Sequence, residues 1–362
     1  MSAKALRFRL MARASPSRAL VLLAPVLAVA LALAFGALMI LALGKSPLQA
    51  FSVYFAQPLA DPFSLAEIAV KASPLVMIAL GLAFCYRANL WNIGAEGQFV
   101  IGGTLGGGIA VATHGMAHAT FWILPAMLIT GALAGALYGL IPAFLKVTLG
   151  VSEILVSLML VYVAQLFLDY LVRGPWRDPK GFNFPVTAGF ESAATLPPLW
   201  PGGAVHAGVG LTLVLVMIMG VVLASTRFGF AVRATGLAPR AAAFAGFDQR
   251  RLTLALFALS GGLAGLAGAV EVSGVINQLQ PSISPGYGFA AIIVAFLGRL
   301  SPWGILLAGL VLALTYIGGE AAQIAMKLPL DLTTAFQGVL LMCVLAADVL
   351  THYRLTITRS AT

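Results

Sequence analysis

The chain has 362 residues, of which 60% are hydrophobic and 9% charged, and its mean hydropathy is +1.00. This composition excludes a water-soluble globule and predicts an all-α polytopic membrane protein. The 21 basic residues outnumber the 12 acidic ones; in a membrane chain this excess reports orientation in the bilayer, so we expect no nucleic-acid partner. The two cysteines, Cys85 and Cys343, lie far apart in apolar runs, which indicates packing residues rather than a disulfide framework or a metal cluster.

The apolar segments predict about ten transmembrane helices within residues 19–350. A basic N-terminus, residues 1–18, precedes an apolar run that is too long for a secretory signal and reads as an uncleaved first helix. The expected spans are 19–43, 66–86, 93–113, 121–145, 154–172, 208–225, 253–274, 288–299, 303–318 and 334–350. The span beginning at Gly288 is too short to cross a bilayer, so we expect a half-helix or re-entrant segment preceded by irregular backbone at 281–286.

The distribution of basic residues predicts the orientation of these spans. With ten spans starting inside, 15 basic residues fall on the inner side, five fall outside, and Lys71 lies within a span. This asymmetry favours a multi-pass membrane protein with both termini, including the tail 351–362, in the cytoplasm. The longest outer loop, 173–207, holds six prolines; we expect it to resist regular helix and to form a cap that meets an extracytoplasmic partner.

The cytoplasmic loop 226–252 carries a basic, alanine-rich stretch, RATGLAPRAAAFAGFDQRR, at residues 233–251. A pure pore would not need it. Five arginines alone would satisfy the orientation rule and would leave an ordinary solvated loop, but the alanine run and the two glycines indicate a docking surface for another protein.

No catalytic constellation is found, and we expect no enzyme activity. Gly44-Lys45-Ser46 lacks the first glycine of a phosphate-binding loop, and His114 and His118 have Gly115 where a zinc helix would carry glutamate. GYGFAA at 286–291 follows no strand, which excludes a dinucleotide site. The chain must therefore take energy for pumping from an ion gradient or from a separate ATPase.

Small and polar residues within the spans have different meanings. Glycines at helical spacing, as in Gly131, Gly135 and Gly139 or Gly261, Gly265 and Gly268, predict close helix packing. Polar side chains must face a cavity, a partner or an interface: these are Glu96, Gln98, Glu153, Asp169, Glu271, Glu320 and Asp348. Glu153, Asp169 and Asp348 lie near helix ends, whereas Glu96 and Glu271 lie deeper.

The string NLWNIGAEGQ at 89–98 resembles the hallmark of permease subunits of ABC importers for nucleosides and simple sugars. SEILVSLML at 152–160, RATGLAPRAAAFAG at 233–246 and SPGYGFAAIIVAFLGRLSPWG at 284–304 resemble successive segments of that family, in order, over most of residues 66–350. The chain is most similar to the longer permease of nucleoside importers. It departs from the family at Val161, where an asparagine is common.

The resemblance implies a type II-like importer permease that works with an ABC ATPase subunit, an extracytoplasmic substrate-binding protein and a second permease subunit, as a heterodimer or a homodimer. It implies no cofactor in this chain, with ATP and Mg on the partner ATPase. The cytoplasmic loop then becomes the coupling helix, in which small alanines enter a groove and arginines pair with acids at its rim. The coupling residues are Arg233, Gly236, Arg240, Ala243, Ala245 and Gly246.

The substrate-path candidates combine aromatic faces with amide and carboxylate groups, which suit a base or a sugar. They are Asn89, Trp91, Asn92, Glu96, Gln98, Gln278, Tyr287 and Phe289, with Gln280 beside them. Residues 89–98 either line the pore or form a buried structural turn near the inner gate. The expected function is import of nucleosides or related small polar solutes. The alternatives are a simple-sugar permease and an ion-coupled secondary carrier that needs intramembrane carboxylates.

Overall fold

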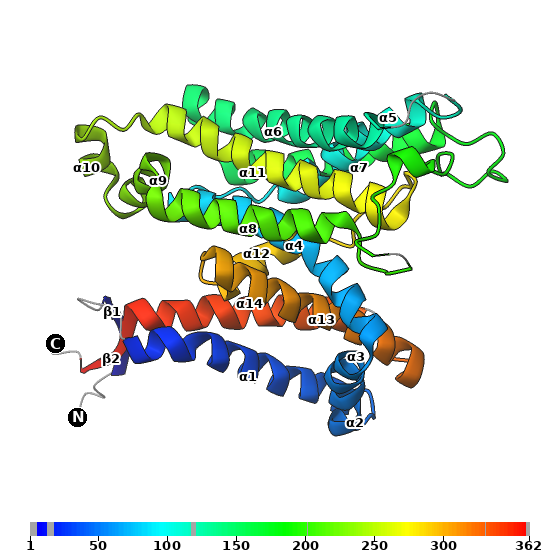
Figure 1. Ribbon diagram of the computed structural model, residues 1–362. Helices are drawn as coiled ribbons and strands as arrows, with labels where there is room; N and C mark the ends of the chain where they lie inside the picture. The colour runs from blue at the N-terminus through cyan, green and yellow to red at the C-terminus, as the bar shows by residue number, and fades with distance from the viewer. Residues whose placement is uncertain (1–5, 13–17, 117–120, 201, 330, 360–362) are drawn as a thin grey trace. The chain divides into compact units, whose positions relative to one another are not determined.

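The computed structural model describes the backbone of residues 6–12, 18–116, 121–200, 202–329 and 331–359. The chain divides into two compact units, a terminal unit of Met1–Gln57 with Gly318–Thr362 and a central unit of Pro58–Ile317 (Figure 1). Every residue of the candidate site lies in the central unit. His118 and the side chain of Asp348, both considered from the sequence, lie outside the described part.

The terminal unit pairs the first and last long helices of the chain. Helix α1 (Arg18–Ala42) packs along α14 (Asp331–His352). In the chain, α1 is followed by α2 (Pro47–Phe51) and the π-helical turn η1 (Ser52–Ala56). Two strands, β1 (Leu6–Ala12) and β2 (Tyr353–Arg359), pair antiparallel with Leu6 opposite Arg359. These short strands are confined to the two ends, and the long elements of the described chain are all helices, as expected of the all-α class. Both segments alternate polar and apolar residues with a period of two, which favours strands.

The central unit is a helical bundle built around α11 (Gln249–Glu271), which packs against α4 (Pro62–Arg87), α5 (Ala95–Ala112) and α6 (Ile123–Leu149). Around this centre lie α7 (Glu153–Arg173), α8 (Ala207–Ser225), α12 (Tyr287–Leu297) and the first part of α13 (Pro302–Met326). The short elements are α3 (Gln57–Ala60), the 3₁₀ turn η2 (Ser192–Ala194), α9 (Arg227–Leu237), α10 (Pro239–Phe244) and the π-helical turn η3 (Val272–Ile276).

A helix lies over each of the ten segments expected to span the membrane. Six helices in the described part of the chain are long and apolar enough to cross a bilayer: Pro62–Arg87, Ile123–Leu149, Glu153–Arg173, Ala207–Ser225, Gln249–Ile276 and Pro302–Met326. Helix α12 has 11 residues, or about 16 Å at 1.5 Å per residue. It is thus half a span, and Gly286 precedes it with φ +95°.

Helix starts follow ordinary capping chemistry. Asp61 precedes Pro62 and accepts hydrogen bonds from the backbone N–H of Phe63 and Ser64, at 3.4 and 3.0 Å. The hydrogen bonds from Ser64 hold the pKa of Asp61 below its usual value. Asp248 caps α11 in the same way. Sequence chemistry at these turns therefore determines where the long helices begin.

Glycines bring α6 and α11 into direct backbone contact. A Cβ atom added at Gly135 would overlap the carbonyl oxygen of Gly261, and one at Gly265 would overlap that of Gly131. Such contact adds van der Waals attraction where lipid supplies no hydrophobic drive. The packing predicted for these glycine stripes is confirmed.

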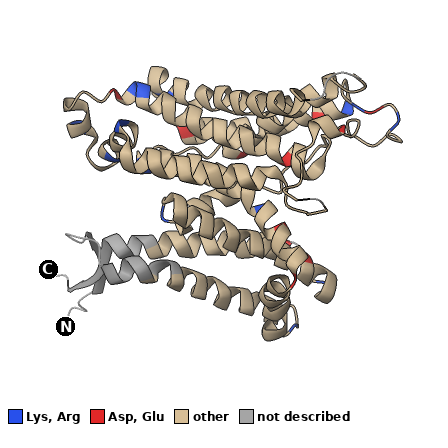
Figure 2. Ribbon diagram, viewed as in Figure 1, with Lys and Arg blue, Asp and Glu red and all other residues tan. Residues whose placement is uncertain are grey.

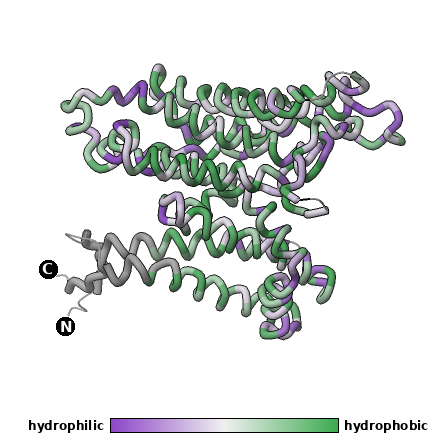
Figure 3. The backbone as a smooth tube through the Cα atoms, in the orientation of Figure 1, coloured by the Kyte–Doolittle hydropathy of each residue, from purple (hydrophilic) through white to green (hydrophobic). Residues whose placement is uncertain are grey.

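Charge and hydropathy separate the ends of the central unit from its body. Figure 3 shows hydrophobic residues dominating the long helices, and Figure 2 shows basic residues gathered at the end formed by α9, α10 and the start of α11. A second charged segment is the loop after α7, at the opposite end. The helices between these two ends carry few charged residues. A charged side chain in this apolar part needs a partner that stabilises it.

Candidate functional site: a re-entrant loop and the helix ends around it

The loop between α4 and α5, residues 88–94, is the centre of the site. It turns back at Asn89, which has a left-handed φ of 56°, and the N–H of Leu90 bonds to the carbonyl of Cys85 at 3.0 Å. The exposed side chain of Asn89 donates from Nδ2 to the carbonyl of Gly236 in α9, at 2.8 Å. The loop is therefore tied to the basic segment of α9 by a hydrogen bond between residues far apart in the sequence.

Asn92 and Gln98 form a reciprocal pair of amides. Asn92 Nδ2 donates to Gln98 Oε1 at 2.8 Å, and Gln98 Nε2 donates back to Asn92 Oδ1 at 3.0 Å. Asn92 Nδ2 also donates to the hydroxyl of Ser260 in α11, at 3.0 Å. Both amides are buried. They use each other's hydrogen-bonding groups, so the pair fixes the loop against α5 and α11.

The string at 89–98 leads from the end of the bundle into its interior. Asn89 is exposed and bonds to α9, whereas Gln98 Nε2 lies against Gly139 of α6. Helix α6 continues ten residues beyond Gly139, to Leu149, which corresponds to about 15 Å. The string is therefore a re-entrant turn, with Asn89 at the end of the bundle and Gln98 inside it.

Trp91 makes an aromatic cluster at the same loop. Its ring centroid lies 5.1 Å from that of Tyr86 and 6.0 Å from that of Phe296, and the Trp91 side chain is 39% exposed. Its backbone N–H reaches Glu153 Oε1 at 3.5 Å. Glu153 in turn pairs with Lys146 at 2.5 Å. The ion pair between Lys146 and Glu153 was not predicted from the sequence, because the two residues lie on different helices.

Glu96 is a buried carboxylate at the meeting point of two helix N-termini. It lies in the first turn of α5, and its Oε2 accepts the backbone N–H of Gly288 in α12 at 2.6 Å. The hydroxyl of Ser284 also bonds to Glu96. These two donors, at the N-terminus of α12, fix the position of the Glu96 side chain within an apolar bundle.

Tyr287 and Glu271 form a second polar cluster beside Glu96. The Tyr287 hydroxyl donates to Glu271 Oε1 at 3.3 Å, and Lys71 interacts electrostatically with Glu271. Tyr287 is fully buried and meets the ring of Phe99 edge-on, at 5.8 Å. The cluster joins α4, α11 and α12.

The other two candidates are more exposed than Tyr287. The side chain of Phe289 is 39% exposed, and Gln278 is half-buried in the irregular segment before α12.

A polar cavity of about 340 Å³ lies between α5, α7 and the segment 281–284. Of the eight path candidates, Glu96 alone is among the described residues that line it. The polar lining also includes Gln165, Asp169, Ser282 and Ser284. Gln165 and Ser282 were missed, because a single amide or hydroxyl in a sequence does not show which helix face meets which loop.

The predicted coupling residues are placed on α9, on α10 and in the turn after α10. Arg240, Ala243, Ala245 and Gly246 are exposed. Arg233 instead donates to the carbonyl of Leu223 at 2.8 Å, closing the end of α8 within this chain. Gly236 packs so closely on the carbonyl of Arg87 that a Cβ atom there would overlap it.

Two large apolar side chains of this segment project into open space. Leu237 is 88% and Phe244 is 95% exposed. With the arginines around them, they give this end an apolar surface with a basic margin, as expected of a protein-docking site.

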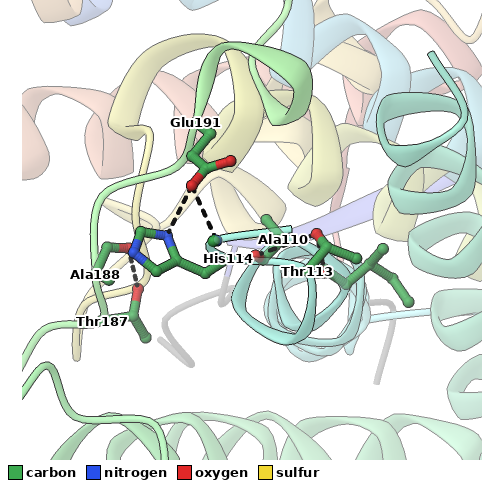
Figure 4. Close-up of polar contacts among 8 residues, drawn as sticks. Ala110, Thr113, His114, Thr187, Ala188 and Glu191 are labelled. Carbon is green, nitrogen blue, oxygen red and sulfur yellow. Dashed lines mark hydrogen bonds and ion pairs between the residues drawn. The ribbon is translucent and has the colours of Figure 1, made fainter. Parts of the chain in front are cut away.

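The opposite end of the bundle joins α5 to the long loop. Figure 4 shows the His114 ring facing Glu191, with 3.7 Å between His114 Nδ1 and Glu191 Oε1. The backbone N–H of Gly115 donates to the same carboxylate oxygen at 3.0 Å. No group of three or more His, Cys, Asp or Glu that could hold a metal ion occurs among the described residues. The loop is held to the bundle by these contacts and by η2.

Comparisons with known proteins agree with this arrangement. The chain is 38% identical over 343 residues to a glucose ABC transporter permease of Haloferax volcanii, covering 92% of this chain and 89% of that protein. It is 30% identical to a guanosine ABC transporter permease of Bacillus subtilis, covering 89% and 92%, and 28% identical to a nucleoside ABC transporter permease of Lactococcus lactis, covering 82% and 83%.

The family match covers all but the first six residues of the central unit and continues into the terminal unit. Residues 64–345 match the model of the branched-chain amino acid transport system permease component. This range includes the re-entrant loop, the cavity and the exposed segment α9–α10. The chain therefore belongs to this family of ABC transporter permeases.

Proposed function

We propose that this chain is the transmembrane subunit of an ATP-driven importer that carries nucleosides across the bacterial inner membrane. Two relatives named for guanosine and nucleoside transport support the solute class. The exposed apolar and basic segment α9–α10 supports an ATPase partner, which would hold the ATP and Mg. In this arrangement ten helical segments lie in the membrane, and both termini lie in the cytoplasm.

The hydrogen bond from Asn89 to Gly236 carries the proposal. It connects the segment that an ATPase would push to the loop that positions α5. The close packing of Gly236 on the carbonyl of Arg87 adds a second link, from α9 to the end of α4. A displacement of α9–α10 would therefore reach the N-terminus of α5, and with it Glu96, through a short chain of packed groups.

The remaining roles follow from burial and exposure. Asn92 and Gln98 hold the loop in place, whereas Glu96 faces the solute path. Arg240, Ala243, Ala245 and Gly246 meet the ATPase, and Gly236 transmits the movement. The loop 174–206 receives a substrate-binding protein, and a second permease subunit, identical or different, completes the path.

Import of a simple sugar is the second candidate function. It is favoured by the 38% identity to the glucose permease of Haloferax volcanii. Selectivity in such a system depends largely on the binding protein, because the permease makes only weak contact with the solute. The two candidates therefore differ in the partner that delivers the solute more than in this chain.

The test is import into proteoliposomes that contain this chain with its ATPase, second permease and binding protein. ATP inside the vesicles should drive uptake of labelled guanosine, or of D-glucose for the second candidate, with no ion gradient present. Uptake that needs an ion gradient and continues without the ATPase would contradict the proposal and indicate a secondary carrier.

A further inference from the structure

The polar cavity between α5, α7 and the segment 281–284 has the size and position of a solute site. Its volume of about 340 Å³ lies at the lower end of the range of small-molecule pockets, about 300–1,000 Å³. Gln165 lies 12 residues beyond the start of α7 at Glu153, which places it about 18 Å along a helix of about 32 Å. The cavity therefore begins just past the middle of the bundle and extends toward Asp169.

Hydrogen-bond acceptors dominate the polar lining of this cavity. Glu96 is fixed by Gly288 and Ser284. Asp169 accepts from Arg173 through Oδ1, at 2.7 Å, which leaves Oδ2 for another donor. Ser284 is held in turn, because its oxygen accepts the backbone N–H of Gly286 and Tyr287 at 3.1 and 3.0 Å. With its hydroxyl fully used, Ser284 serves to position Glu96, and the carboxylates of Glu96 and Asp169 are the fixed acceptors of the lining.

Gln165 and Ser282 add adaptable groups to the fixed acceptors. Gln165 is exposed on α7 and offers both an amide donor and a carbonyl acceptor. Ser282 is exposed beside it, with its hydroxyl donating to the carbonyl of Ser284 at 3.3 Å. Several acceptors with a few donors match the hydroxyl groups of a sugar, each of which can donate and accept.

Aromatic and cationic groups are absent from the described lining of the cavity. Trp91 stacks with Tyr86 and Phe296 instead, and Tyr287 packs against Phe99 and bonds to Glu271. The cavity therefore offers no ring to stack on a base, and no cation to balance a phosphate beside its two carboxylates.

We infer that this cavity recognises the hydroxyl groups of a neutral sugar or ribosyl moiety during passage and makes no specific contact with a base. The inference rests on the proposed function, since it assigns the solute contact within the same path. This inference explains how related permeases can carry glucose and guanosine, two solutes that share hydroxyl groups and otherwise differ.

The first arm of the experiment measures import by the complete transporter in proteoliposomes. Gln165→Leu and Ser282→Ala each remove one hydrogen-bonding group from the lining, and each should lower the rate of guanosine or D-glucose import about two- to tenfold, as expected for one lost hydrogen bond. Tyr162→Phe is the matched control, because it removes an exposed hydroxyl from α7 outside the cavity. This control should import at the wild-type rate.

The second arm detects occupancy without ATP. Ser282→Cys is introduced together with Cys343→Ser, while Cys85 stays because it is buried. Guanosine and D-glucose should slow the reaction of the new cysteine with a maleimide, whereas guanine, a base without hydroxyl groups, should leave the rate unchanged.

The outcomes separate the two proposals. In one outcome the wild type imports solute, Gln165→Leu and Ser282→Ala import at the same rate, and neither solute slows the maleimide reaction of Ser282→Cys. This outcome would overturn the cavity assignment and leave the proposed function standing. Equal protection by guanine and guanosine would overturn the assignment to hydroxyl groups. If neither guanosine nor D-glucose is imported with ATP, the proposed function fails, and protection of the cysteine still decides whether the cavity binds hydroxyl groups.

Discussion

The side chain of Asn89 donates a hydrogen bond to the main-chain carbonyl of Gly236, 2.8 Å away. The two residues belong to different segments of the chain. Asn89 lies in the re-entrant loop before α5, and Gly236 lies in the basic segment that we propose as the docking surface for the ATPase. The contact is exposed at the end of the bundle, and the close packing of Gly236 on Arg87 lies beside it. The two segments are therefore held together by close packing as well as by the hydrogen bond.

Replacing Asn89 by glycine should weaken this coupling. Glycine keeps the left-handed φ and removes only the amide, so the chain should still fold and bind its ATPase. We expect import per ATP hydrolysed to fall about two- to tenfold, the effect of one lost hydrogen bond. The measurement is solute uptake and phosphate release in the same proteoliposomes.

Asn277 provides the matched control, because it is exposed and has the same φ of 56°. Asn277→Gly should leave the ratio of import to hydrolysis unchanged. If both variants behaved alike, the Asn89 hydrogen bond would have no part in coupling.

Reversing the charge of Arg240 should release the ATPase. Arg240 is exposed at the start of α10, and a glutamate there would repel acidic groups on a partner. We expect Arg240→Glu to insert normally and to lose most of the ATPase on co-purification. Lys180→Glu, an equal charge change in the exposed loop after α7, should retain it; retention by both variants would contradict the assignment of α10.

Much of the helical framework could be predicted from the sequence. The apolar runs located ten helical segments, the shortness of the run at 288 indicated the half-helix α12, and Pro239 with its alanines indicated α10. These are local signals, because apolar length, a proline at the first turn and the absence of breakers lie within a few residues. The pairing of β1 with β2 was missed, because it joins segments at opposite ends of the chain.

The site was predicted less completely, because its geometry depends on contacts between distant residues. The string at 89–98 directed attention to the loop before α5 and left open whether it lines the pore or forms a structural turn. The structure shows Asn92 and Gln98 bonded to each other and Glu96 facing a cavity. Which side each polar group faces depends on the register of α5 against α7, α11 and α12, and a single sequence does not contain that register.

Two ion pairs of this chain should differ in their contribution to stability. Lys146 and Glu153 lie 2.5 Å apart with side chains 32% and 8% exposed, whereas Arg173 and Asp169 are 59% and 36% exposed. Glu153→Ala leaves two partly buried donors, the Lys146 ammonium and the Trp91 N–H, without this partner and should lower the free energy of unfolding by about 1–3 kcal/mol. Asp169→Ala should cost less than about 1 kcal/mol. Thermal unfolding of the purified permease in detergent gives the comparison; a larger loss for Asp169→Ala would contradict the structural ranking.

Acid should destabilise the permease through His206. This residue is buried at the start of α8, where its Nδ1 accepts the backbone N–H of Gly208 at 3.1 Å. Burial lowers the pKa of His206 below its ordinary value of about 6.5. The unfolded chain then binds a proton more readily than the folded one, so this contribution to stability is complete above about pH 6.5 and is lost as the pH falls toward the lowered pKa of the folded state.

The variant His206→Asn keeps a side-chain acceptor for the helix start and cannot gain this proton. Its unfolding temperature should therefore change less between pH 8 and about pH 5.5 than that of the wild type, a window set by the ordinary histidine pKa. His114→Asn is the matched control, because His114 is exposed at the end of α5, and it should retain the wild-type pH dependence. A wild-type pH dependence in His206→Asn would show that another group titrates.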